Sequence, residues 1–258
     1  MTRLDDDLGH PLDMRRPPTR VVSLVPSLTE AIADAVPDRL VGATDWCTHP
    51  AGLDVPRVRG TKNPDHGAIT RLRPDLVVAN QEENRRIDVE RLRAEGVPVW
   101  VTVIESLDQA FRSIRRLFVD VLAVSEPTWL PAAAAEWSRP FELPAARVLV
   151  PIWRDPWMAV GARTFSGDMV TRLGLLHLLG GSGERYPKLG LDAMARLHPD
   201  LVLLPDEPYA FAEDDGPEAF PGAVVALVSG RSLTWYGPSM ATARAELTDR
   251  IRTALASA

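Results

Sequence analysis

The feature that most constrains this fold is a sequence pattern that occurs twice. Residues 72–78 read LRPDLVV and residues 197–203 read LHPDLVL, 125 positions apart. Each pattern is typical of a helix end, a Pro-Asp corner and a buried strand. Two further apolar strands, RVVSL at 20–24 and RVLV at 147–150, lie 127 positions apart. The repeat predicts two lobes of similar plan, with chance similarity of a common helix–corner–strand unit as the alternative.

Strands alternate with helices in both halves of the chain. Strands are expected at 21–24, 40–43, 76–79, 97–103, 147–152, 201–204 and 224–228. The alternation predicts an α/β fold in which two lobes of mainly parallel sheet are flanked by helices. Ligand sites are expected beyond the carboxyl ends of the strands. The predicted divisions are a disordered or extended segment at 1–19, an N-terminal α/β lobe at 20–104, a linking helix region at 105–145 and a C-terminal α/β lobe at 146–258.

Four helix boundaries are also predicted. Ser27 and Glu30 have the spacing of a capping box at a helix start. Ser166 is expected to cap a helix that turns Leu176 inward and ends at the glycine pair 180–181. In the linking region, Pro127 and Pro131 should break or kink the long helix.

Composition excludes several classes of protein. With 258 residues, 45% of them hydrophobic, the chain can bury a large core, so disorder is excluded. No apolar run approaches the roughly 20 residues of a membrane-spanning helix. A net charge of -6 argues against a nucleic-acid partner, which requires a basic face. A single cysteine, Cys47, excludes an internal disulfide framework and a multi-cysteine metal site.

The first twenty residues carry three consecutive aspartates and no apolar signal region. As written, the sequence therefore predicts a cytoplasmic location without a signal peptide. If the start codon were mis-assigned, the location would be extracytoplasmic.

Aromatic side chains gather in loops that follow predicted strand ends. Such residues bury a large area and keep a polar tip, which suits them to grip a broad, flat ligand. The alternative is that they form a minor core beneath the loops. The residues are Trp46, Trp153, Trp157, Tyr186, Tyr209, Trp235 and Tyr236.

Polar side chains stand among these aromatics. Lys62, Arg154 and Arg185 could pair with ligand carboxylates or phosphates, and structural salt bridges are the alternative. Carboxylates that could accept amide or hydroxyl protons are those of Glu82, Glu83 and Glu207.

Cys47 and His49 form the one pair with metal-ligand chemistry, but two ligands make only half a zinc site. We therefore predict no metal of the protein's own and keep these two residues as weak candidates. His49 is also considered as an axial ligand to a metal already held in a macrocycle.

Motifs of several enzyme classes are absent. The sequence has no G-x-x-x-x-G-K-[ST] loop, no G-x-G-x-x-G, no G-x-S-x-G and no H-E-x-x-H. No nucleophile–base pair is visible, so we predict a protein without catalytic residues or a catalytic cofactor.

Several segments resemble one known family. They include VGATDWCTHP (41–50), GTKNPD (60–65), LRPDLVVANQEEN (72–84), RYP (185–187), LHPDLVLLPDEPYAF (197–211) and TWYG (234–237). The chain from about 20 to 255 is similar to the helical-backbone, or class III, substrate-binding proteins. This is the Fe/B12 periplasmic-binding domain group, which includes the vitamin B12 receptors of bacterial importers.

The resemblance implies two α/β lobes joined by a rigid helix, with a ligand held between them. It adds Asn84 and the loop carrying Glu82 to the aromatic residues as expected ligand contacts. It also implies an ABC importer permease as partner. The glutamates that dock such a permease would match Gly67 and Asp192 here, so at least one of these contacts is weakened.

The function predicted is non-catalytic binding of a metal chelate, as in the substrate-binding component of an ABC importer. Cobalamin or another corrinoid is the first candidate ligand, followed by haem and ferric siderophores. One alternative is a cytoplasmic enzyme or chaperone that handles a tetrapyrrole or metal complex. Another is a domain that has lost ligand binding and serves as a regulatory partner.

Overall fold

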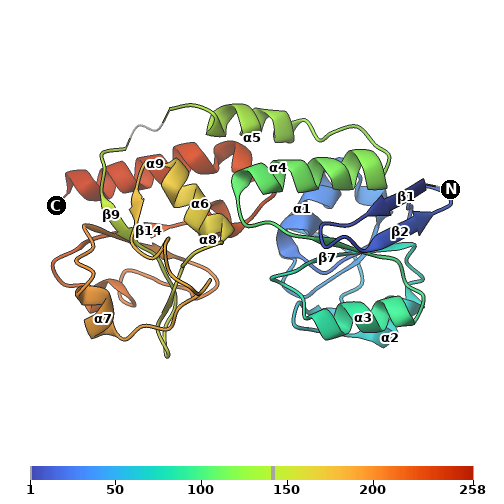
Figure 1. Cartoon of the computed structure of the whole chain (residues 1–258), viewed down its shortest axis with the longest axis horizontal. Coiled ribbons are helices and arrows are strands. Elements are labelled where there is room, and N and C mark those ends of the chain that lie inside the picture. Colours follow the sequence, from blue (N-terminus) through green and yellow to red (C-terminus); the bar gives the residue numbers. More distant parts are fainter. Residues whose placement is uncertain (1, 141–142, 258) are drawn as a thin grey trace. The chain divides into compact units, whose positions relative to one another are not determined.

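The chain folds into two compact units. The computed structural model describes residues 2–140 and 143–257. Met1 in the predicted N-terminal segment, residues 141–142 in the predicted linking region and Ala258 in the predicted C-terminal lobe lie outside these ranges. Unit 1 contains the chain up to Ile104, with Asp108–Pro131 and Tyr236–Pro238 (Figure 1). Unit 2 contains Glu105–Leu107, Ala132–Trp235 and the chain from Ser239 onward.

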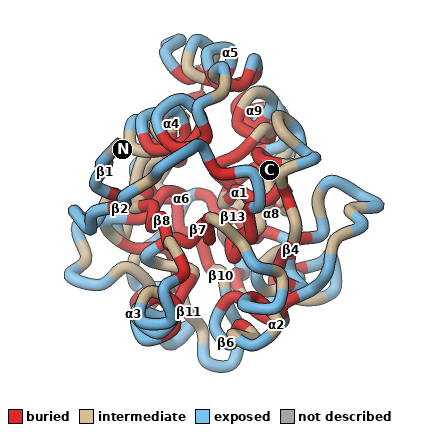
Figure 2. Tube along the Cα trace, turned by 90° about the vertical axis from the view of Figure 1, so that its right-hand side faces the viewer, coloured by how far each residue is buried: buried red, intermediate tan, exposed pale blue. Residues whose placement is uncertain are grey.

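Unit 1 is built on a four-stranded parallel sheet of order β4-β3-β7-β8. The strands are β3 (Val21–Ser23), β4 (Leu40–Ala43), β7 (Leu76–Asn80) and β8 (Val99–Thr102). The helices of this unit include α1 (Pro26–Ala35), α2 (His66–Arg71) and α3 (Arg86–Ala94), with a short 3-10 turn at Pro37–Arg39. Strand β7 is buried along its whole length (Figure 2), as its unbroken apolar sequence predicts.

Unit 2 repeats the plan with a parallel sheet of order β12-β9-β13-β14. The strands are β9 (Arg147–Leu149), β12 (Leu176–His177), β13 (Leu201–Pro205) and β14 (Val224–Val228). Its helices include α6 (Phe165–Arg172), α7 (Leu191–Ala195), α8 (Gly230–Thr234) and α9 (Met240–Ala256). The α/β class with parallel sheets flanked by helices is thus confirmed. The cleft predicted between the lobes stays a prediction.

Small hairpins decorate the two sheets, and none of them was expected. They are β5–β6 (Arg59–Gly60 with Asn63–Pro64) in unit 1, and β10–β11 (Pro151–Trp153 with Met158–Ala159) in unit 2. A 3-10 turn at Pro217–Ala219 follows β13. Because such two- and three-residue strands are too short to show a periodic pattern, the sequence does not reveal them.

The predicted disordered or extended segment at 1–19 contains an antiparallel hairpin of β1 (Thr2–Asp5) and β2 (Pro11–Met14). Asp6, in the turn, is buried, and its carboxylate accepts the backbone N–H of His10 at 2.8 Å. The N–H of Asp7 donates to the carbonyl oxygen of Val101 at 3.1 Å. The hairpin turn therefore covers the outer edge of β8.

The linking region holds α4 (Leu107–Arg115), a π-helical continuation at Arg116–Val121 and α5 (Trp129–Trp137). The helix is interrupted at 122–128, where Ala123 has φ +50°. Pro127 lies in this interruption, as predicted, because proline cannot supply the N–H that continues a helix. Pro131, in contrast, lies in the first turn of α5 and does not break it, because the N–H groups of a first turn have no partner within the helix.

Three predicted helix boundaries are wrong. Helix α1 starts at Pro26, with Val25 as N-cap, and no side chain caps it. Ser27 and Glu30 therefore do not form the predicted capping box. Helix α6 is capped by Thr164, whose hydroxyl accepts the N–H of Gly167 at 3.2 Å. It ends at Arg172, because the left-handed turn at Gly174 (φ +87°) stops it. Leu176 then starts an edge strand and is 58% exposed.

Within residues 2–140 and 143–257, no helix combines the length and the apolar character needed to cross a membrane.

Candidate functional site

In unit 1 the loop after β4 presents an exposed tryptophan. Trp46 is 65% exposed, and the preceding residue, Asp45, is fixed by an N–H bond of 2.9 Å to the carbonyl of Arg59. A side chain on Gly60 would place its Cβ 3.2 Å from the indole nitrogen of Trp46. The edge of the indole therefore lies against the β5–β6 hairpin, where glycine leaves room for it.

The same hairpin carries Lys62, whose ammonium group donates to the carbonyl of Glu82 in the loop after β7. Lys62 is exposed and Glu82 is half-buried. The structure thus places three predicted contact residues of unit 1 on three adjoining segments, with Trp46 after β4, Lys62 in the β5–β6 hairpin and Glu82 after β7. Their role in ligand binding stays a prediction.

Asn84, also predicted to contact the ligand, is buried, and its side-chain amide forms hydrogen bonds with backbone groups. Its side-chain oxygen accepts the N–H of Asn80 at 2.9 Å. Its amide donates to the carbonyls of Leu24 at 3.2 Å and Thr61 at 3.0 Å. Because all these polar atoms fix loops within unit 1, the structure gives Asn84 a structural role instead of the predicted one.

The weak metal candidate Cys47 is fully buried. Its sulfur lies 3.0 Å from the hydroxyl of Thr29 and 3.1 Å from that of Thr44. Burial raises the pKa of the Cys47 thiol, and the two hydroxyls and Arg57 only partly offset this. A metal ligand must be the thiolate, so the environment disfavours this role.

His49 is half-buried, with Nδ1 3.1 Å from the hydroxyl of Thr48. Among the residues that the structure describes, no three histidine, cysteine or acidic side chains gather in a way that could hold a metal ion. His49 remains a candidate only as an axial ligand to a metal that arrives in a chelate.

In unit 2 the β10–β11 hairpin and the loop after β13 build an aromatic cluster. Trp153, 41% exposed, meets Tyr209 edge-on with ring centroids 5.9 Å apart. Trp157 stacks on Phe211 at 5.8 Å and meets Phe220 edge-on at 5.4 Å. Trp157 thus belongs to a minor core beneath the loops, which is the alternative to ligand contact that we considered for these aromatics. Trp153 is the more exposed of the two tryptophans in this cluster.

Arg154 lies inside this cluster and has two acidic partners. It forms ion pairs with Asp215 and, at 2.6 Å, with Glu218. Its guanidinium carbon also lies 5.4 Å from the centre of the Trp157 ring. These partners come from the acidic segment 213–218, which the sequence analysis did not connect with Arg154.

The other predicted aromatics are less accessible. Trp235 and Tyr236 are buried, with exposed fractions of 8% and 6%, so neither presents the open ring that the sequence predicts. The indole N–H of Trp235 bonds to the carboxylate of Glu207. Burial and the neighbouring charge of Asp206 raise the pKa of Glu207. Tyr186 is half-buried in a segment that runs beside β11 through backbone bonds of residues 185 and 187.

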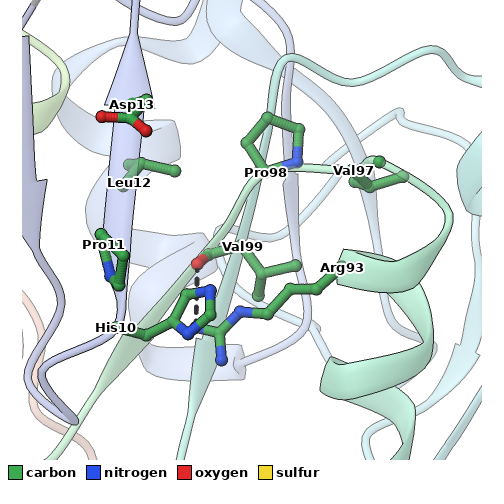
Figure 3. A pocket seen from close by; sticks show the side chains of 9 residues that line it. His10, Pro11, Leu12, Asp13, Arg93, Val97, Pro98 and Val99 are labelled. Atoms are coloured by element: carbon green, nitrogen blue, oxygen red, sulfur yellow. Dashed lines mark hydrogen bonds between the residues drawn. The ribbon is translucent and has the colours of Figure 1, made fainter.

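A small pocket of about 200 Å³ lies elsewhere in unit 1, between the N-terminal hairpin and the start of β8 (Figure 3). None of the predicted site residues lines it. Its lining residues are His10, Pro11, Leu12, Asp13, Arg93, Gly96, Val97, Pro98 and Val99.

Comparison with known proteins shows which solved structures share this fold. No family model matches the chain. The vitamin B12-binding protein of Pectobacterium carotovorum is 22% identical over 203 residues, which cover 74% of this chain and 72% of the relative. Among solved structures, the periplasmic vitamin B12-binding protein BtuF of Vibrio cholerae superposes with a TM-score of 0.75 at 17% identity. That match covers 93% of this chain and 98% of BtuF.

This chain has the class III, Fe/B12 periplasmic-binding fold. The periplasmic haem-binding protein BhuT, solved with two haems, shares the fold with a TM-score of 0.72 at 23% identity, over 92% of this chain and 98% of BhuT. The fold that the sequence resemblance implies is thereby confirmed. At these identities the likeness concerns the fold, and the class III fold hosts more than one chelate.

Proposed function

We propose that this protein is the non-catalytic substrate-binding component of an ABC importer and that it binds a flat metal chelate. A corrinoid such as cobalamin is the first candidate, and haem is the second. The observation that carries the proposal is the class III fold, shared over more than nine-tenths of the chain with B12- and haem-binding proteins. Exposed tryptophans at strand ends of both units support it.

The chemistry of the loops agrees with this proposal. Trp46 and Trp153 offer ring faces that suit a planar macrocycle, because offset stacking buries a large apolar area. Lys62 and Glu82 offer a cation and a carboxylate for polar groups on the ligand's rim. Such a ligand is expected to be released chemically unchanged.

Titration of the purified protein with cyanocobalamin, haemin and a ferric siderophore tests the proposal, with absorption difference spectra and calorimetry as readouts. We expect saturable one-site binding of one of these ligands. Trp46→Ala and Trp153→Ala should each weaken it about five- to tenfold through lost stacking. Ile87→Ala, a change at another exposed apolar residue, should leave the affinity unchanged. Absence of a response to all three ligands would refute the proposal.

We further propose an importer permease as partner. Gly67 and Asp192 are the second residues of α2 and α7, as the family resemblance implies. Asp192 could pair with a cationic permease side chain, whereas Gly67 offers none. Co-purification with an importer permease from the protein's own host, for the wild type and for Asp192→Ala, measures this contribution, and we expect less permease to be retained by Asp192→Ala.

The prediction of a cytoplasmic location finds no support among the relatives, since BtuF and BhuT are described as periplasmic. We therefore propose that the protein works outside the cytoplasm. N-terminal sequencing of the native protein, with fractionation of its host, tests this location.

A further inference from the structure

The Arg154 side chain is largely enclosed by groups of unit 2. It is 27% exposed and faces two carboxylates, those of Asp215 and Glu218. Both carboxylates help raise the pKa of the guanidinium, with the hydrogen bond to Glu218 the largest contribution. One positive charge opposed by two negative charges leaves no surplus cation to attract an anionic ligand.

The same contacts tie two segments together. Arg154 follows β10, whereas its acidic partners lie in the segment 206–220 after β13. Asp215 also accepts the hydroxyl hydrogen of Tyr209 at 2.6 Å. Tyr209 in turn packs against Trp153 in an edge-to-face arrangement, with ring centroids 5.9 Å apart. A continuous path of contacts thus leads from Arg154 through Asp215 and Tyr209 to the exposed indole.

We propose that Arg154 is a positioning residue, which fixes the β10–β11 hairpin on the 206–220 segment and thereby sets the orientation of Trp153. It does not bind acidic groups of the ligand, in contrast to the role that its charge alone predicts. Unit 2 consequently recognises its ligand by ring stacking. The expected effect of Arg154 on ligand affinity rests on the proposed function. Its expected effect on the orientation of Trp153 does not.

A mutational cycle tests the inference in the full-length protein. Arg154→Met is made in the wild type and in the Asp215→Asn/Glu218→Gln background, where the amides keep hydrogen-bond acceptors but lose their charge. If Arg154 acts through the carboxylates, the background change alone should weaken chelate binding about tenfold, and Arg154→Met should then add less than twofold. Arg154→Lys should restore part of the affinity, and Arg250→Met, on the exposed face of α9, should have no effect.

If Arg154 instead contacts the ligand, Arg154→Met will cost the same factor in both backgrounds, and neutralising the two acids will not weaken binding. Either result overturns the inference.

A second readout does not depend on any ligand. In protein labelled with 5-fluorotryptophan, the ¹⁹F resonance of Trp153 is assigned with Trp153→Phe. We expect this resonance to shift or broaden in Arg154→Met and in the acid-neutral background, while the resonance of Trp46 stays in place. An unchanged Trp153 resonance overturns the inference even if every chelate binds. If no chelate binds the wild type but the resonance moves, the proposed function fails and the positioning role stands.

Discussion

Glu207 follows β13 and has one carboxylate oxygen that is buried without a hydrogen-bond partner among the described residues. The backbone of Gly230 lies so close that an added Cβ would fall 2.3 Å from the Glu207 Cγ. Glycine is therefore required there, and the glutamate cannot turn in that direction to find a partner. Burial, with the charge of Asp206, keeps its pKa above the ordinary value of 4.5.

A raised pKa means that the folded protein holds the Glu207 proton more tightly than the unfolded chain does. Its contribution to stability is complete below about pH 4.5 and is lost as pH rises through the raised value. Glu207→Gln removes this dependence, so we expect it to stabilise the protein at pH 8 relative to wild type, with little difference at pH 4. Urea unfolding from pH 4 to pH 8 measures the effect.

Glu213→Gln provides the control, because it makes the same chemical change at an exposed position of the segment that follows β13. A Glu207→Gln variant that is less stable at pH 8 than at pH 4, relative to wild type, would contradict the prediction.

Cys47 is the other residue whose chemistry burial decides. Because its thiol is enclosed and its pKa is raised, we expect it to react with Ellman's reagent at pH 8 at least about 100-fold more slowly than an exposed thiol. A matched control is Thr48→Cys in a Cys47→Ala background, which moves the thiol one residue to an exposed position. Comparable rates for the two proteins would show that the region opens readily in the folded state.

Among the secondary-structure elements, the central strands were predictable and the small hairpins were not. Strands such as β7 and β13 are buried on both faces, so they read as continuous apolar runs between Pro-Asp corners. The N-terminal hairpin has no comparable pattern. Its place depends on Asp6 and Asp7, in a run of aspartates that, read alone, suggested a solvated segment.

The structure shows that Asp6 is the central anchor of that hairpin. Its carboxylate accepts two N–H groups of its own turn, at Leu8 (3.0 Å) and His10 (2.8 Å), and pairs with Arg93 at 2.6 Å. It also accepts the N–H of Val101 at 3.3 Å, on the outer edge of β8. The Asp6 carboxylate thus accepts an N–H at the edge of the sheet that a neighbouring strand would otherwise bond. Covering the edge in this way protects it from pairing with other chains.

Replacing Asp6 by alanine would leave the half-buried Arg93 guanidinium without its carboxylate and the N–H of Val101 without that acceptor. We therefore expect Asp6→Ala to lower the free energy of unfolding by about 3 kcal/mol, because breaking a buried pair costs more than the pair contributes. It should also increase amide exchange in β8. The exposed residue Asp5 supplies the control, since Asp5→Ala removes only an outward-facing carboxylate. Equal stability of the two variants would refute the anchoring role.

For the whole molecule, ligand binding is expected to increase the free energy of unfolding. A chelate that binds only the folded protein stabilises it by about 2.7 kcal/mol at a free concentration of 100 Kd. We expect saturating cyanocobalamin or haemin to raise the melting temperature by several degrees, in a concentration-dependent way. Differential scanning fluorimetry can rank the ligands, with adenosine as a control that lacks the macrocycle. A melting temperature that no chelate changes would contradict the proposed function.

The sequence alone determined the two-lobed α/β plan and the longer strands of its sheets, because buried parallel strands require continuous apolar runs and both lobes repeat the same corner. It missed the two-residue edge strand β12, which the sequence analysis placed inside a helix. It also predicted that aromatics follow the strand ends. Only the tertiary structure decided which of these rings stay open, as at Trp46 and Trp153, and which are covered, as at Trp235. Tertiary structure also turned Asn84 and Arg154 inward to partners within their own units. Such roles depend on neighbours distant in sequence, and a residue's type shows what it can bind but not what already binds it.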